Sequence, residues 1–143
     1  MDALSIAVIV FVVLESANVV VLYFAPGSKK GNGVGVFNAY EKSRDYPEIH
    51  AFIKYLVNWI AGTKLIFIFL LVVVFITGSR TTKLLAVAAL ILSIATFYWR
   101  LYPAVRKMDK QDSISPKGYS KTLFIMITIF LLGFSAAMAI SVL

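Results

Sequence analysis

Glu15 is the residue of this sequence that most suggests chemistry. It lies near the middle of the apolar stretch VVLESANVVVLYF, residues 12–24, in a segment long enough to cross a bilayer. An unpaired charge at that depth costs about 2.5–3.5 kcal/mol on insertion scales, so the carboxylate needs a partner, water or a bound proton. Charged side chains inside a membrane commonly mark functional sites, and Glu15 is therefore the first candidate.

Lys64 is the expected partner of Glu15. Glu15 lies 11 residues from Leu4 and Lys64 lies 13 residues from Thr77, both counted from the same predicted side of the membrane. At 1.5 Å per residue, the two depths differ by only about 3 Å. The two charges can therefore meet near the middle of the bilayer if the first and second helices are neighbours.

Four further polar residues complete the candidate intramembrane site, and all are expected nearer the cytoplasm. Asn18 shares a helix face with Glu15, whereas Asn58 lies about 120° around its helix from Lys64. Arg100 is close enough to the cytoplasmic interface for its guanidinium to reach it. The four residues are Asn18, Asn58, Tyr98 and Arg100.

Two interpretations of this set remain open. In the first, a Glu15–Lys64 ion pair and asparagine hydrogen bonds fix the register of the helices. In the second, a polar cavity opens to the cytoplasm and Glu15 binds a cation or a proton there. A catalytic role has less support, because the chain shows no nucleophile–base set or paired carboxylates and has one histidine and no cysteine. We therefore expect no catalytic residues, no metal and no cofactor.

The stretch VVLESANVV around Glu15 resembles the first helix of the small multidrug resistance transporters, which carry one carboxylate mid-way along the first of four helices. The resemblance covers little more than this helix and the number of helices, and it implies a carboxylate that binds a cationic substrate. The third helix, LAVAALILSIATFYW, lacks the glycine-rich packing pattern of that family, and Lys64 would compete with a cationic substrate.

Four apolar segments must position these residues. The chain has 143 residues, of which 60% are hydrophobic, more than the roughly 45–50% of a soluble domain. Asp2 is a plausible N-cap of the first helix, Pro47 suits the first turn of the second, and the third is expected to stop near Pro103. The pattern predicts an all-α, integral membrane four-helix transmembrane bundle, a single domain over residues 1–143, with helices at 4–24, 47–77, 82–102 and 118–142.

The basic residues predict the orientation. The first long connection, residues 25–46, and the start of the second helix hold five lysines and arginines, and residues 100–121 hold six. The opposite side has only Arg80 and Lys83, so the positive-inside rule places both termini outside and both long connections in the cytoplasm. The net charge of +7 is then expected to attract anionic lipid headgroups rather than nucleic acid. We expect a multi-pass protein of a plasma or inner membrane.

Two smaller features also carry predictions. Residues 36–46 can form a short amphipathic helix on the headgroups or can be a solvated loop. In the helix, Val36, Phe37 and Tyr40 would face inward and Lys42 and Arg44 outward. In the last helix, small residues repeat every four positions, a pattern that allows close packing within the bundle or against a second copy. This stripe is Gly133, Ala137 and Ser141.

These features favour a small transporter- or channel-like membrane protein, with Glu15 and Lys64 at its polar site, acting on an ion or small molecule that the sequence does not identify and associating with further copies. The alternative is a non-catalytic membrane subunit or scaffold that packs against a partner through its last helix or its basic connections. A lipid-modifying enzyme is a third hypothesis.

Overall fold

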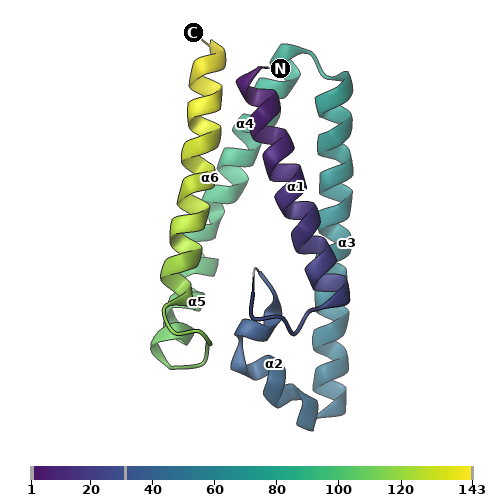
Figure 1. Ribbon diagram of the computed structural model, residues 1–143, viewed down its shortest axis with the longest axis vertical. Coiled ribbons are helices and arrows are strands. Elements are labelled where there is room, and N and C mark those ends of the chain that lie inside the picture. The colour runs from purple at the N-terminus through teal and green to yellow at the C-terminus, as the bar shows by residue number, and fades with distance from the viewer. Residues whose placement is uncertain (1, 31, 143) are drawn as a thin grey trace.

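The computed structural model describes residues 2–30 and 32–142 and shows an all-α bundle (Figure 1). Its principal helices are α1 (Ala3–Phe24), α3 (Pro47–Thr77), α4 (Arg80–Ala95) and α6 (Tyr119–Val142). Within the described residues, four helical segments are long and apolar enough to cross a membrane, the third of them running from Arg80 to Lys110. The predicted fold class is confirmed, and both termini lie at the same end of the bundle.

The predicted helix boundaries on α1 and α3 follow from local chemistry. The Asp2 carboxylate accepts a hydrogen bond from the Ser5 backbone N–H at 2.7 Å, as expected of an N-cap. Pro47 is the first residue of α3. A backbone N–H at that position has no intrahelical acceptor, so the missing N–H of proline costs no hydrogen bond. The tight turn after α3 ends at Ser79, whose hydroxyl accepts from the Thr82 N–H at 3.2 Å and caps α4.

The third spanning segment differs from the prediction of one helix over residues 82–102. The α-helix ends at Ala95, a single 3-10 turn (η3, Thr96–Tyr98) follows, and α5 (Leu101–Lys110) continues the chain. Pro103 does not stop the helix, because it is the third residue of α5, where a backbone N–H would have no intrahelical acceptor. The second long connection is correspondingly shorter than the predicted 103–117.

The first long connection folds onto the second instead of lying on headgroups. It contains η1 (Val34–Val36), α2 (Asn38–Lys42) and η2 (Ser43–Asp45), with Val36 and Tyr40 buried and Lys42 exposed as predicted. The buried side packs on protein, however, since Val36 joins a cluster with Phe97, Val105, Ile114 and Leu123.

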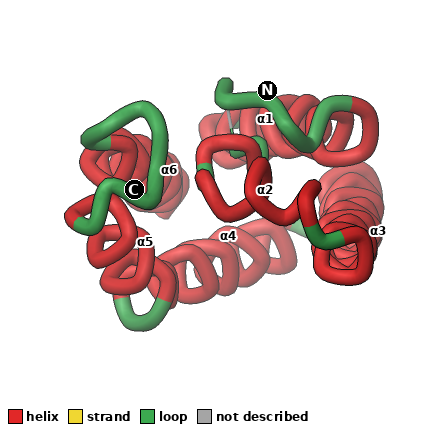
Figure 2. The backbone as a smooth tube through the Cα atoms, turned by 90° about the horizontal axis from the view of Figure 1, so that it is seen from below, coloured by secondary structure: helices red, strands yellow, loops and turns green. Residues whose placement is uncertain are grey.

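Backbone hydrogen bonds join the two connections. The Asn38 N–H donates to the Ser113 carbonyl at 3.0 Å, and the Ser115 N–H donates to the Val36 carbonyl at 2.8 Å. Seen along the bundle, α2 lies across the end of the space that the long helices surround (Figure 2). We call this the connection end, and the end that holds both termini the terminal end.

The core is divided along the bundle. Near the terminal end α1 packs against α3, α4 and α6, and the Phe11 ring contacts Phe67, Phe130 and Phe134 with centroids 5.4–6.1 Å apart. Toward the connection end, the buried residues of α1 pack with α3 through Val19 and Ala61. Here α1 leans toward α3 and away from α6, so the helices separate in the lower half of the bundle (Figure 1).

Candidate functional site

Glu15 and Lys64 form the ion pair that depth matching predicts. The Lys64 Nζ donates a hydrogen bond to the Glu15 Oε2, which links the middle of α1 to the middle of α3. The pairing requires α1 and α3 to be neighbours, and their shared buried cluster shows that they are. The two side chains keep 19% and 30% of their surface exposed, so the pair is not sealed in the core.

A cavity of about 450 Å³ lies beside this pair. It is bounded by α1, α3, α4 and α6, and its polar lining is Glu15, Asn18, Lys64 and Asn32. The Oδ1 of Asn18 is buried and has no hydrogen-bond partner among the described residues. A buried acceptor without a partner costs about 1–3 kcal/mol, so this oxygen favours a donor on water or on a ligand.

Asn32 is the site residue that the sequence did not indicate. It lies in the glycine-rich stretch at residues 28–35, which carries no helical periodicity from which its position could be predicted. The structure turns residues 32–35 inward, with the Gly35 N–H donating to the Pro26 carbonyl at 3.0 Å. A Cβ at Gly35 would lie 2.0 Å from the Gly27 carbonyl oxygen, so glycine is required for the close approach.

Three of the predicted polar residues lie outside the cavity. Asn58 and Arg100 are exposed, and the Arg100 guanidinium lies over the Trp99 ring at 5.1 Å from its centroid. The Tyr98 hydroxyl hydrogen-bonds to the Thr128 Oγ1 at 2.7 Å and thereby links η3 to α6. The predicted set therefore separates into a cavity group and residues that serve other contacts.

The small-residue stripe of α6 also divides. Ala137 and Ser141 are buried, and Ala137 belongs to the core cluster at the terminal end. Gly133 is exposed, and a Cβ added there would meet no atom within 4 Å. Packing within the bundle therefore accounts for two of the three positions, while Gly133 faces open space.

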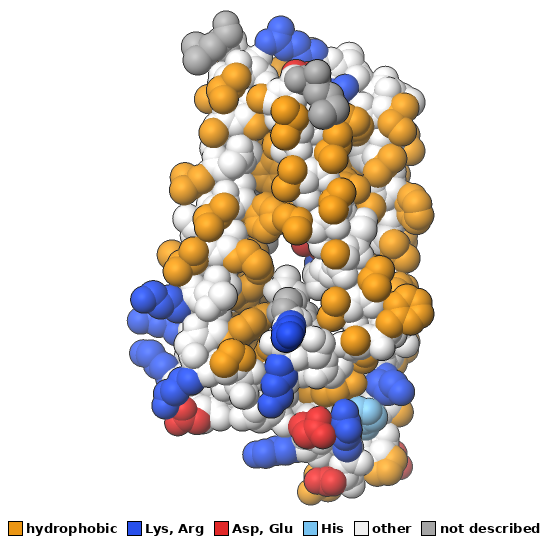
Figure 3. All heavy atoms as spheres, in the orientation of Figure 1, with side chains coloured by type: hydrophobic (Ala, Val, Ile, Leu, Met, Phe, Trp, Pro, Cys, Tyr) orange, Lys and Arg blue, Asp and Glu red, His pale blue; other side chains and the backbone are white. Residues whose placement is uncertain are grey.

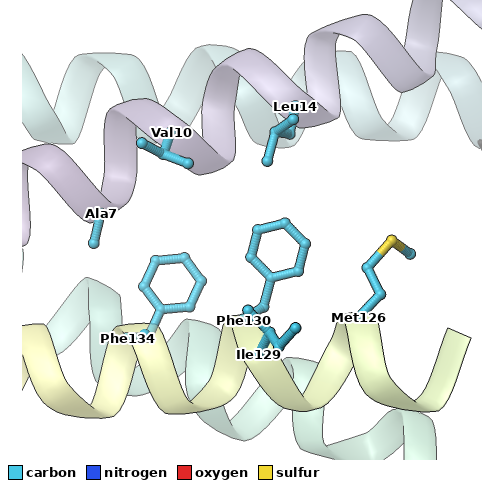
Figure 4. A pocket seen from close by; sticks show the side chains of 8 residues that line it. Ala7, Val10, Leu14, Met126, Ile129, Phe130 and Phe134 are labelled. Carbon is cyan, nitrogen blue, oxygen red and sulfur yellow. The ribbon is translucent and has the colours of Figure 1, made fainter. Parts of the chain in front are cut away.

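That space is a groove of about 390 Å³ between α1 and α6, lined entirely by apolar residues (Figure 4). Leu14 of α1 and Met126 and Phe130 of α6 line both the groove and the polar cavity. In Figure 3, charged atoms are visible in a hollow near the middle of this otherwise apolar face. The groove and the cavity therefore adjoin at these three side chains.

Asp109 holds the connection end in place. Its carboxylate accepts hydrogen bonds from the Ser120 hydroxyl at 2.5 Å and from the Gly118 and Ser120 N–H groups at 3.0 Å, at the start of α6. Roughly 20 residues of α-helix span the hydrocarbon, so α5 lies beyond the part of its segment that does. The Ser120 hydroxyl, more than the two N–H groups, lowers the pKa of Asp109 below its ordinary value of 3.8.

Within residues 2–30 and 32–142, no group of three or more histidine, aspartate or glutamate side chains could hold a metal ion. No protein-family model matches the chain, and comparisons with curated proteins and with solved structures find no match either. The function is therefore argued from the geometry of the Glu15–Lys64 site.

Proposed function

We propose that this chain is a small transporter- or channel-like membrane protein whose working site is the cavity at the Glu15–Lys64 pair. One observation carries the proposal: the paired charges border a cavity of about 450 Å³ midway along the helices, instead of being packed between them. Charged residues at such depth face a bundle interior or a water-filled cavity, where they bind ions, protons or substrates.

A purely structural ion pair would be expected to have a different environment. Desolvating two charges is costly, and the cost is recovered only when good geometry and further hydrogen bonds satisfy both groups. Here both side chains retain exposed surface, and the neighbouring Asn18 Oδ1 has no partner within the described chain. These properties support a site that exchanges partners, because a bound polar group would satisfy atoms that the protein alone does not.

Cysteine labelling tests whether water enters the cavity. The natural sequence has no cysteine, so single cysteines can be introduced without other changes. Ile127 lines the cavity, whereas Ile125 is 48% exposed, lies nearly opposite around α6 and does not line it. A charged methanethiosulfonate reacts with the thiolate, which forms only where water is present. We expect Ile127→Cys to react at least about tenfold faster than Ile125→Cys.

The control, Ile125→Cys, makes the test a stringent one. Ile125 lies nearer the start of α6 and so nearer the interface, where simple penetration of water would favour its modification. Slow reaction at both positions would show a dry cavity, and the chain would then be better described as a non-catalytic membrane subunit.

A further inference from the structure

The groove between α1 and α6 determines how a ligand could reach the polar site. Its walls are open to the side, since Val10 on α1 is 49% exposed and Ile129 on α6 is 63% exposed. Both residues lie in segments that can span a membrane, so this opening faces lipid tails and not water. Figure 4 shows the side chains of the two helices facing one another across the groove.

The groove adjoins the cavity that holds the ion pair. Leu14, Met126 and Phe130 belong to both spaces, so an apolar chain in the groove would end beside the polar cavity. Volumes of about 390 and 450 Å³ both fall within the usual size range of small-molecule pockets, roughly 300–1,000 Å³. A molecule that fills both must be apolar along its length and polar at one end.

The charges that line the cavity determine which polar head group a ligand can carry. Glu15 and Lys64 neutralise each other, and no other ionisable side chain of the described chain lines the groove or the cavity. A charged head would therefore add an uncompensated charge near the middle of the membrane, which is costly. The Asn18 Oδ1 needs a hydrogen-bond donor, which a hydroxyl or an amide N–H provides without charge.

We propose that this pocket binds a neutral single-chain amphiphile that enters from the bilayer between α1 and α6. Its apolar chain lies in the groove, and its hydroxyl or amide head lies at Asn18 and the Glu15–Lys64 pair. This inference rests on the proposed function, because it assigns a substrate class to the same polar site.

Gly133 keeps the groove open. A Cβ at this position meets nothing within 4 Å, so a larger side chain can extend into the groove without displacing the backbone. Gly133→Leu is therefore a blocking variant that leaves the ion pair intact. Ala7→Leu on the facing wall blocks the same space if the first variant does not fold.

Tryptophan quenching by brominated amphiphiles tests the site. In a background in which Trp59 and Trp99 are phenylalanine, Ile129→Trp reports on the groove. Phe69→Trp is the matched control on α3, because Phe69 is 66% exposed and lines no part of either space. The probes are 12-bromododecanol, 12-bromododecanoate and 12-bromododecyltrimethylammonium, added to the protein in bilayer nanodiscs.

We expect 12-bromododecanol to quench Ile129→Trp saturably. The mole fraction of probe required should be at least about tenfold lower than the one that quenches Phe69→Trp to the same extent. Gly133→Leu or Ala7→Leu should remove the saturable part, while the rapid labelling of Ile127→Cys persists. Loss of that labelling in the unblocked protein would contradict the proposed function; failure of saturable quenching alone would contradict only this inference.

Three results would overturn the inference. Quenching of Ile129→Trp that rises only in proportion to the probe, as at Phe69→Trp, would show simple partitioning into lipid. Tighter saturation by the carboxylate or the ammonium probe would show that the head is not neutral. Complete protection of Ile129→Trp in a dimeric protein would assign the groove to a second copy of the chain.

Discussion

At the scale of the residue, an ion pair joins Glu15 of α1 to Lys64 of α3, and both side chains border a cavity that leaves them partly exposed. Helix rise and the lengths of two apolar segments determine depth, and depth was enough to match the two charges. The same argument could not distinguish Asn18, which lines the cavity, from Asn58, which is exposed. Helical periodicity places Asn18 on the face of Glu15 and Asn58 about 120° from Lys64, but how α1 and α3 are rotated and tilted against each other decides which of these faces borders the cavity.

Stability measurements should show a pair that is coupled yet hydrated. Removing one partner of a fully buried ion pair typically lowers the free energy of unfolding by about 3–5 kcal/mol. Because the cavity reaches both side chains, we expect Glu15→Gln or Lys64→Met to lower the free energy of unfolding by only about 1–2 kcal/mol. The double change removes both charges and should restore most of that loss. Additive losses in detergent unfolding would show that the residues are not coupled.

Asp109 predicts a dependence of stability on pH. Its pKa is lowered in the folded state, chiefly by the Ser120 hydroxyl, so its contribution is present above the unfolded value of 3.8. The contribution is lost as the pH falls through the lower, folded pKa. We expect the melting temperature in detergent to fall below about pH 4 and Asp109→Asn to reduce that fall. Asp45→Asn, at an exposed carboxylate, is the control and should not change it.

At the scale of the element, helices that span the membrane were predicted well, and the connections were predicted poorly. The lengths of the apolar stretches and the residues at their ends predicted the ends of α1, α3 and α6 to within about one residue. The prediction works because a helix needs about 20 apolar residues to cross a bilayer. The break between α4 and α5 and the folding of α2 onto the second connection depend on contacts between distant segments, such as the bridge of Phe37 and Ile114. The sequence of each segment alone does not predict those contacts.

Two glycines should respond in opposite ways to the same substitution. A Cβ at Gly35 would lie 2.0 Å from the Gly27 carbonyl oxygen, so Gly35→Ala must shift the backbone beneath the cavity and should cost about 1–3 kcal/mol. Gly133 is helical with open space around it, so Gly133→Ala should be neutral or stabilise by up to about 1 kcal/mol. Thermal unfolding of both variants checks this, and equal losses would contradict the account.

At the scale of the whole molecule, the separation of α1 from α6 toward the connection end gives the bundle its site. The terminal end is packed around Phe11 and Ala137, while a cavity extends toward the connection end and adjoins a lateral groove. If α1 and α6 were in contact along their whole length, their side chains would enclose the Glu15–Lys64 pair. The groove, which reaches Ala7, lies nearer the terminal end than the cavity, which reaches Val21. The predicted orientation, with both termini outside, therefore places the cavity on the cytoplasmic side of the groove.

Lys64→Cys shows whether small polar molecules reach the Glu15–Lys64 pair. Aminoethyl methanethiosulfonate converts this cysteine into a positively charged analogue of lysine, so a reagent that reaches position 64 also restores the partner of Glu15. We expect rapid modification and recovery of the melting temperature toward that of the natural protein, without recovery when Glu15 is glutamine. A Lys64→Cys protein that stays unmodified while folded would contradict this expectation.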